Sequence, residues 1–246
     1  KLRSVMADVY MQSNDRVSSE RVYQEILAED PGDHLALIGL VRINVMNGDA
    51  AKAQDYLAKA KAAGVPRQRL LYETVGLELA VGEVDRARII AQELVEIDPN
   101  NAEAHVVMSA IASQLYLDAK TPEATESALK SLQKAVAELE RVSGKEDFRT
   151  LFVKGRMHLI TRNYAEAREN FKAALKRAPN PNIVPLLDSI LTADHALVDK
   201  EAALKTSREI LHRDPRHGFA NYILGSLALE REEYASAEDY LARSLE

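Results

Sequence analysis

The sequence predicts an all-α protein built from repeated helical hairpins, and three observations support this prediction. The segment 148–181 places apolar and small residues at helical spacing in two stretches, which a short polar turn at residues 161–163 separates. Small residues recur at a fixed interval, since Gly48 and Gly82 lie 34 positions apart. Prolines follow the predicted second helices at Pro31, Pro99, Pro179 and Pro215.

The hairpin 148–181 shows why these residues recur. Gly155 and Ala167 are small at the positions where two helices must approach closely, and Phe171 is large where a gap must be filled. At the turn between two such helices the backbone often needs a positive φ, which favours glycine at positions such as Gly48. We therefore expect each hairpin to pack on its neighbours.

This pattern resembles the tetratricopeptide repeat, a helix–turn–helix unit of about 34 residues. Within 148–181 the matching residues are Leu151, Gly155, Tyr164, Ala167, Phe171, Ala174 and Pro179. Leu151 stands where the family has Trp, and His158 replaces the usual Tyr. The resemblance implies a right-handed superhelical solenoid of about seven stacked repeats in a single domain, 1–246. We expect the repeats at 1–33, 34–67, 68–101, 102–147 with an insertion, 148–181, 182–217 and 218–246.

The fourth repeat is irregular, and its helix starts follow from capping residues. Asn101 is the expected N-cap of its first helix. Thr121, followed by Pro122, is the expected start of its second helix.

The composition excludes several classes of site. The chain of 246 residues has no cysteine, so it forms no disulfide and no thiolate metal site. A net charge of −6, no Trp and only 5% aromatic residues argue against nucleic acid as a partner. No apolar run approaches the roughly 18 residues of a membrane span, so we expect no direct membrane contact from this segment. The chain starts at Lys1 and stops within a predicted helix, so we expect it to be part of a longer protein. Both the cytoplasm and a bacterial periplasm fit this composition.

No catalytic, cofactor or metal site is expected. The segment 141–145 resembles the end of a phosphate-binding loop but lacks the leading glycine and follows no strand. His105 and His158 lie on the inner faces of first helices, where a hydrogen-bonded core histidine is the expected role.

In the tetratricopeptide repeat family the first helices line the inner, concave surface, and the resemblance places fourteen residues there. These are Leu35, Ile38, Arg42, Met46, Arg69, Tyr72, Val106, Arg149, Phe152, Arg156, Ile183, Leu186, Phe219 and Tyr222. Because most are apolar, we expect a groove for an apolar or amphipathic segment of a partner protein. Arg149 and Arg156, beside Phe152, could bind an acidic group of that partner. Two alternatives stay open: these side chains pack against the adjacent hairpin, or a helix of the parent chain fills the groove.

The expected function is a non-catalytic scaffold for protein–protein interaction. The Lys, Asn and Arg clamp by which chaperone-binding members hold a terminal carboxylate is missing from the corresponding positions, so we expect no such recognition. An alternative is a structural spacer or oligomerisation module, with possible self-association through the apolar C-terminal end. Members of the family occur in bacterial secretion, exopolysaccharide-export and envelope assemblies. A third alternative is an enzyme whose active site lies elsewhere in the parent chain.

Overall fold

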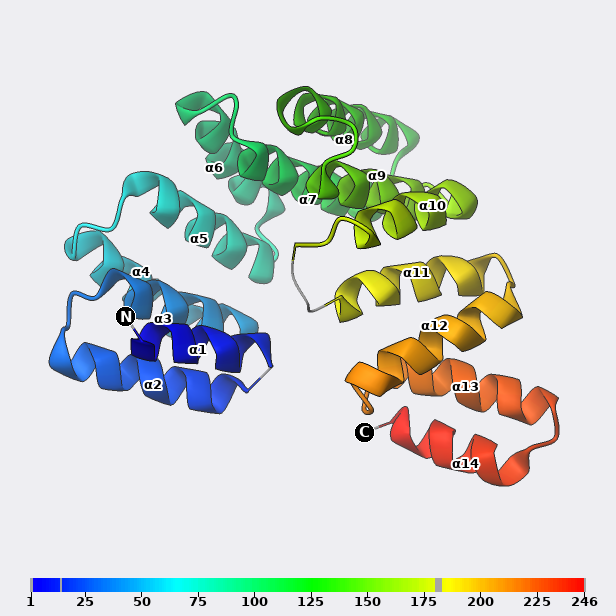
Figure 1. The fold of residues 1–246 in the computed structure, drawn as a ribbon. Coiled ribbons are helices and arrows are strands. Elements are labelled where there is room, and N and C mark those ends of the chain that lie inside the picture. Colours follow the sequence, from blue (N-terminus) through cyan, green and yellow to red (C-terminus); the bar gives the residue numbers. More distant parts are fainter. Residues whose placement is uncertain (1, 14, 180–182, 246) are drawn as a thin grey trace. The chain divides into compact units, whose positions relative to one another are not determined.

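The computed structural model describes residues 2–13, 15–179 and 183–245, and this part of the chain is almost entirely helical (Figure 1). It contains fourteen α-helices and no strand. The helices are α1 (Leu2–Gln12), α2 (Arg16–Glu29), α3 (His34–Met46), α4 (Ala50–Ala62), α5 (Arg67–Ala80), α6 (Val84–Ile97), α7 (Ala102–Asp118), α8 (Pro122–Ser143), α9 (Phe148–Ile160), α10 (Tyr164–Leu175), α11 (Val184–Ala196), α12 (Lys200–Arg213), α13 (Gly218–Glu230) and α14 (Tyr234–Arg243).

The chain forms two compact units, residues 1–131 and 132–246, and α8 contains the boundary between them. In the first unit α1 pairs with α2, α3 with α4 and α5 with α6, while α2, α4 and α6 each pack on the helix that follows. In the second unit α9 pairs with α10, α11 with α12 and α13 with α14, and α10 and α12 pack on the next hairpin. The predicted all-α repeat architecture is confirmed.

The boundaries of the seven repeats stay a prediction. Residues 1, 180–182 and 246, at which some of these boundaries fall, lie outside the described residues.

Helix starts follow the capping residues that the sequence provides. Asp33 accepts a hydrogen bond from the N–H of Ala36 at 2.8 Å at the start of α3. The predicted caps Asn101 and Thr121 are confirmed: Asn101 Oδ1 accepts the N–H of Glu103 at 3.0 Å, and Thr121 Oγ1 accepts that of Ala124 at 3.2 Å. These bonds satisfy N–H groups that have no partner within the helix.

The turn inside a hairpin requires a left-handed residue two positions after the first helix ends. Gly48 and Gly82 meet this requirement with φ of 75° and 83°, as predicted. The second unit places Arg162, Val198 and Glu232 at the same position, with φ of 63°, 58° and 61°. Such residues are strained there because Cβ comes close to the backbone. The fold therefore fixes this turn even where the sequence provides no glycine.

Paired helices come close where a small residue faces a large one, as predicted for Gly155. A Cβ on Gly155 would lie 2.6 Å from the ring of Phe171, which is fully buried. A Cβ on Gly225 would likewise lie 2.7 Å from Cγ of Leu241. Ala167 is also fully buried in this core. In these hairpins a bulky side chain occupies the space that the missing side chain leaves.

Within the described ranges, no helix is both long enough and apolar enough to cross a membrane.

We expect Gly155→Ala to lower the free energy of unfolding by about 1–3 kcal/mol, because the added methyl overlaps the Phe171 ring. Gly76→Ala in α5 is the matched control, since nothing lies within 4 Å of the added carbon there. That change should raise stability by about 0.5–1 kcal/mol, as alanine favours a helix interior. Urea denaturation measures both, and equal stability of Gly155→Ala and the unchanged protein would contradict the close-contact model.

We expect Val198→Gly to raise the free energy of unfolding by about 0.5–1 kcal/mol, because it removes left-handed strain from a residue that is 72% exposed. The reverse change at the equivalent turn, Gly82→Val, should destabilise the protein. Thermal unfolding would detect both shifts, and a destabilised Val198→Gly variant would show that the side chain's contacts outweigh the strain.

Candidate functional site

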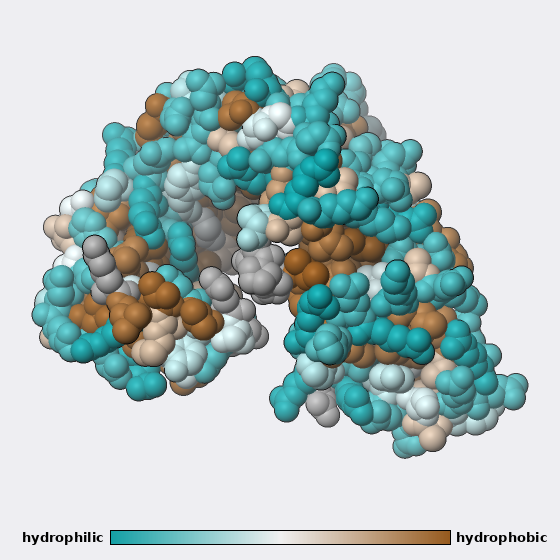
Figure 2. All heavy atoms as spheres, viewed as in Figure 1, coloured by the Kyte–Doolittle hydropathy of each residue, from teal (hydrophilic) through white to brown (hydrophobic). Residues whose placement is uncertain are grey.

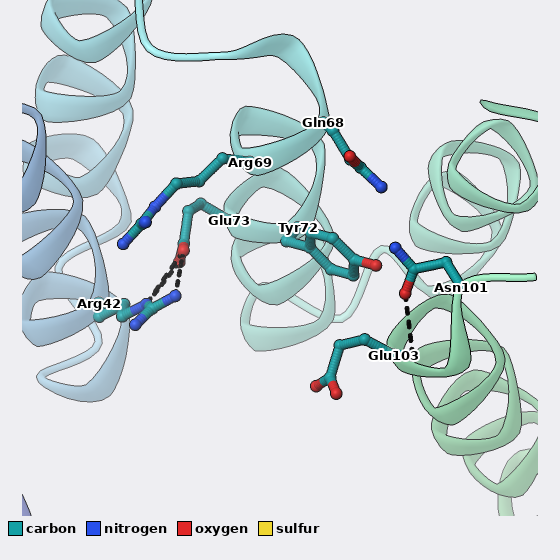
Figure 3. Close-up of a pocket in the computed structure, with 7 residues that line it drawn as sticks. All are labelled: Arg42, Gln68, Arg69, Tyr72, Glu73, Asn101 and Glu103. Atoms are coloured by element: carbon teal, nitrogen blue, oxygen red, sulfur yellow. Dashed lines mark hydrogen bonds and ion pairs between the residues drawn. The ribbon is translucent and has the colours of Figure 1, made fainter. Parts of the chain in front are cut away.

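The first unit contains a hollow of about 510 Å³ that the helices α3, α5 and α7 line, and Figure 3 shows its side chains. A second hollow of about 350 Å³ shares Arg42 and Arg69 with it and extends toward α1, α2 and α3. The first is lined by Arg42, Gln68, Arg69, Tyr72, Glu73, Asn101 and Glu103, and the second by Asp8, Met11, Tyr23, Leu35, Ile38, Gly39, Arg42 and Arg69. Together we call these residues the α3–α5–α7 site.

A bidentate ion pair lies at the centre of this site. Arg42 Nε donates to both carboxylate oxygens of Glu73 at 3.0 Å, and Nη2 donates to Oε1 at 2.5 Å (Figure 3). The Glu73 side chain is only 7% exposed, whereas that of Arg42 is 53% exposed. The hydrogen bond to Glu73 raises the pKa of Arg42. The pair thus joins adjacent first helices and neutralises a buried carboxylate.

Two other polar side chains of the site, Tyr23 and Asn101, form local hydrogen bonds. The Tyr23 hydroxyl donates to Asp8 Oδ1 at 2.5 Å, and burial is the main cause of its raised pKa. Asn101 uses its side-chain oxygen to cap α7. Burial also raises the pKa of Tyr72, whose ring points toward Asn101 in Figure 3.

Two charged side chains of the first hollow remain available for ion pairs. Among the described residues, Arg69 and Glu103 are both exposed and neither forms an ion pair. In Figure 3 Arg69 extends away from α5 toward Arg42 on α3, and Glu103 points from α7 into the hollow. A ligand could therefore reach a positive and a negative group on neighbouring helices.

The structure brings only some of the fourteen predicted residues together. Those that belong to the α3–α5–α7 site are Leu35, Ile38, Arg42, Arg69 and Tyr72, whereas Met46 and Val106 line neither hollow. In the second unit Phe219 and Tyr222 stack with ring centroids 6.4 Å apart, and Ile183 and Phe152 pack against the core cluster there.

Three expectations about this surface need correction. Ile38 and Leu186 are 1% and 4% exposed, because neighbouring helices cover them, so both are core residues, although Ile38 also borders the second hollow. The hollow of about 510 Å³ is not apolar, since six of its seven lining residues are charged or amide side chains.

The third correction concerns the two arginines predicted to bind an acidic group. Arg149 is bonded to Asp147, with Nε 3.0 Å from Oδ1. Arg156, in contrast, is exposed and pairs with no described carboxylate. Desolvation by the surrounding protein lowers its pKa.

The fourteen sequence-based candidates omitted Gln68, Glu73, Asn101 and Glu103. Glu73 lies four positions after Arg69 and thus on the same helix face, a signal that the sequence did contain. For Asn101 no such signal exists, because a capping residue before α7 reaches the hollow only through the way α7 packs on α6.

The predicted role of His105 is confirmed, because this residue is 5% exposed and its Nε2 lies 2.9 Å from the carbonyl oxygen of Pro99. In the described part of the chain no group of three or more His, Asp or Glu side chains could hold a metal ion.

A family model described as tetratricopeptide repeat matches residues 5–68, 125–181 and 198–246, which is more than half of the chain. The chain belongs to the tetratricopeptide repeat family. Proteins of this family generally mediate protein–protein interactions, and such scaffolds are generally not enzymes.

Solved structures share this repeat fold. A thermophilic tetratricopeptide repeat protein of Thermus thermophilus has a TM-score of 0.65 and 18% identity, covering 83% of this chain and 98% of the other. A tetratricopeptide repeat protein of Parabacteroides merdae has a TM-score of 0.59 and 14% identity, covering 99% of this chain and 98% of the other.

One curated relative has a higher sequence identity over a short segment. Cellulose synthase 1 operon protein C of Komagataeibacter xylinus is 34% identical over 55 residues, which are 22% of this chain. The match spans only 4% of that relative's length.

We expect Arg42→Met to destabilise the tetratricopeptide repeat stack by about 1–3 kcal/mol, because it leaves the buried Glu73 carboxylate without its partner. The double variant Arg42→Met/Glu73→Gln should recover most of the loss. Removing the exposed pair Arg21–Glu25 on α2, with Arg21→Met/Glu25→Gln as the matched control, should change stability by less than about 0.5 kcal/mol. Urea denaturation of all variants gives the coupling energy, and additive effects of the two site changes would contradict this interaction.

Proposed function

We propose that this chain is a non-catalytic scaffold that binds a segment of a partner protein at the α3–α5–α7 site. The hollow supports this proposal because it offers polar and charged groups from three successive first helices over a continuous surface. An extended segment that crosses these helices would meet hydrogen-bonding groups of Gln68 and Tyr72, the two free charges, and the half-exposed Leu35. The single observation that matters most is the exposed, unpaired state of Arg69 and Glu103 beside a fully paired Arg42 and Glu73.

A purely binding role fits the state of the titratable groups. The buried carboxylate of Glu73 is already neutralised by a bidentate guanidinium, so it is poorly suited to proton transfer. The exposed groups Arg69 and Glu103 are in contrast suited to ion pairs with a ligand.

The second unit could provide a further contact. We place an acidic group of a partner near Arg156, because this guanidinium is exposed and has no described carboxylate partner. Arg149, which binds Asp147, is less suited to this role. Phe152 packs against Phe171, with ring centroids 5.9 Å apart, and thus helps to hold α9 and α10 together next to Arg156.

A second candidate function is a structural spacer or oligomerisation module within a larger assembly. The segment shared with a cellulose synthase operon protein favours it, as do exposed apolar side chains on the outer helices. Figure 2 shows hydrophobic side chains over α1, where Leu2, Val5 and Val9 are 86%, 59% and 55% exposed. On α14 and beyond it, Tyr234 and Leu245 are 66% and 90% exposed.

Light scattering at several protein concentrations separates the two candidates. A scaffold that acts alone should keep the mass of one chain at every concentration. An increase of mass with concentration, lost when Val5 and Val9 are changed to Ser, would favour the oligomerisation module.

We expect Gln68→Trp to abolish binding of peptides that the unchanged chain selects from a display library of random 12-residue peptides, because the indole fills the hollow. Gln54→Trp on α4 is the matched control, since Gln54 lines a separate hollow that shares no residue with this one. Fluorescence anisotropy with labelled peptides measures both affinities. Loss of binding in Gln54→Trp alone would place the partner on the other surface and reject the proposed site.

A further inference from the structure

We infer that the α3–α5–α7 site selects an extended partner segment whose apolar, acidic and basic side chains meet α3, α5 and α7 in that order, with the apolar and acidic side chains about three residues apart. This inference rests on the proposed function and specifies the chemistry of its ligand.

The order comes from one position that recurs with the repeat. Leu35, Arg69 and Glu103 lie 34 residues apart, the same interval that separates Gly48 from Gly82. They belong to the first turns of α3, α5 and α7, and all three are exposed. Successive first helices therefore present an apolar, a positive and a negative side chain at equivalent places.

The other charged groups of the site already form bonds within the chain. Arg42 is bound to Glu73, and Asp8, which keeps its negative charge, accepts the hydroxyl of Tyr23 in the second hollow. In the first hollow, Arg69 and Glu103 are the charged side chains that form no ion pair among the described residues. A partner's carboxylate would pair with Arg69, and its ammonium or guanidinium group would pair with Glu103.

The spacing follows from helix and strand geometry. The helices α3 and α5 pack against each other, and axes of packed helices lie about 8–10 Å apart. An extended chain advances about 3.3 Å per residue, so about three residues span the step from α3 to α5. A helical ligand would advance only about 1.5 Å per residue and would need a much longer spacing.

The test compares the peptides that different variants select from the same 12-residue display library. The unchanged chain should enrich peptides with an apolar and an acidic residue about three positions apart and a basic residue on the far side of the acidic one. The charge exchange Arg69→Glu/Glu103→Arg should enrich the order apolar, basic, acidic instead. Either single reversal should weaken a peptide selected by the unchanged chain by about tenfold or more.

The control is a second charge exchange outside the site, Arg21→Glu/Glu25→Arg on α2, which keeps the net charge and should leave the selected peptides unchanged. Circular dichroism confirms that each variant is folded. If the site exchange selects the same peptides as the unchanged chain while Gln68→Trp still abolishes their binding, the charge order is rejected and the proposed function stands. If Gln68→Trp selects and binds the same peptides, the proposed function fails and this inference fails with it.

Discussion

The close approach of paired helices is the constraint on which this structure depends. At Gly155 there is no room for even one methyl group beside the ring of Phe171, and Gly225 faces Leu241 in the same way. Such contacts fix the distance between the two helices of a hairpin and leave each hairpin with an apolar face for the next. Because the hairpins repeat at 34 residues, equivalent side chains of successive first helices come to lie along one surface. A local packing rule thereby creates an extended surface.

Within the first unit this surface separates charges that stabilise the fold from charges that remain free. The Arg42–Glu73 pair is partly buried and spans two hairpins, so its main effect is to hold α3 against α5. Arg69 lies one helical turn from Glu73 but has no carboxylate partner among the described residues, as is true of Glu103. A charge that already has a partner within the protein gains little from a ligand of opposite charge. An unpaired charge in a hollow can form a favourable ion pair with such a ligand. The same short segment of α5 thus contains a charge that stabilises the fold and a charge that we propose contacts a partner.

The second unit uses its aromatic residues differently from what their spacing suggests. Phe152 lies between Phe148, at a centroid distance of 6.1 Å, and Phe171, at 5.9 Å, so much of its surface is covered by other rings. Among the predicted groove residues of this unit, Arg156 and Tyr222 are exposed. An apolar residue on the inner face of a first helix can thus pack into its own hairpin, while a longer charged neighbour reaches solvent.

By itself the sequence determined the helical hairpins, the caps at Asn101 and Thr121, the left-handed turns at Gly48 and Gly82, and the small residue opposite Phe171. All of these depend on residues close in the chain or on a regular interval, so periodicity was enough to predict them. It also placed Leu35, Arg42, Arg69 and Tyr72 on one surface. Only the tertiary structure decided that Ile38 and Leu186 are covered, that Arg42 is bound to Glu73 and that Asn101 lines the hollow. Burial and ion pairing depend on the distances between successive hairpins, which helical spacing within one hairpin does not specify.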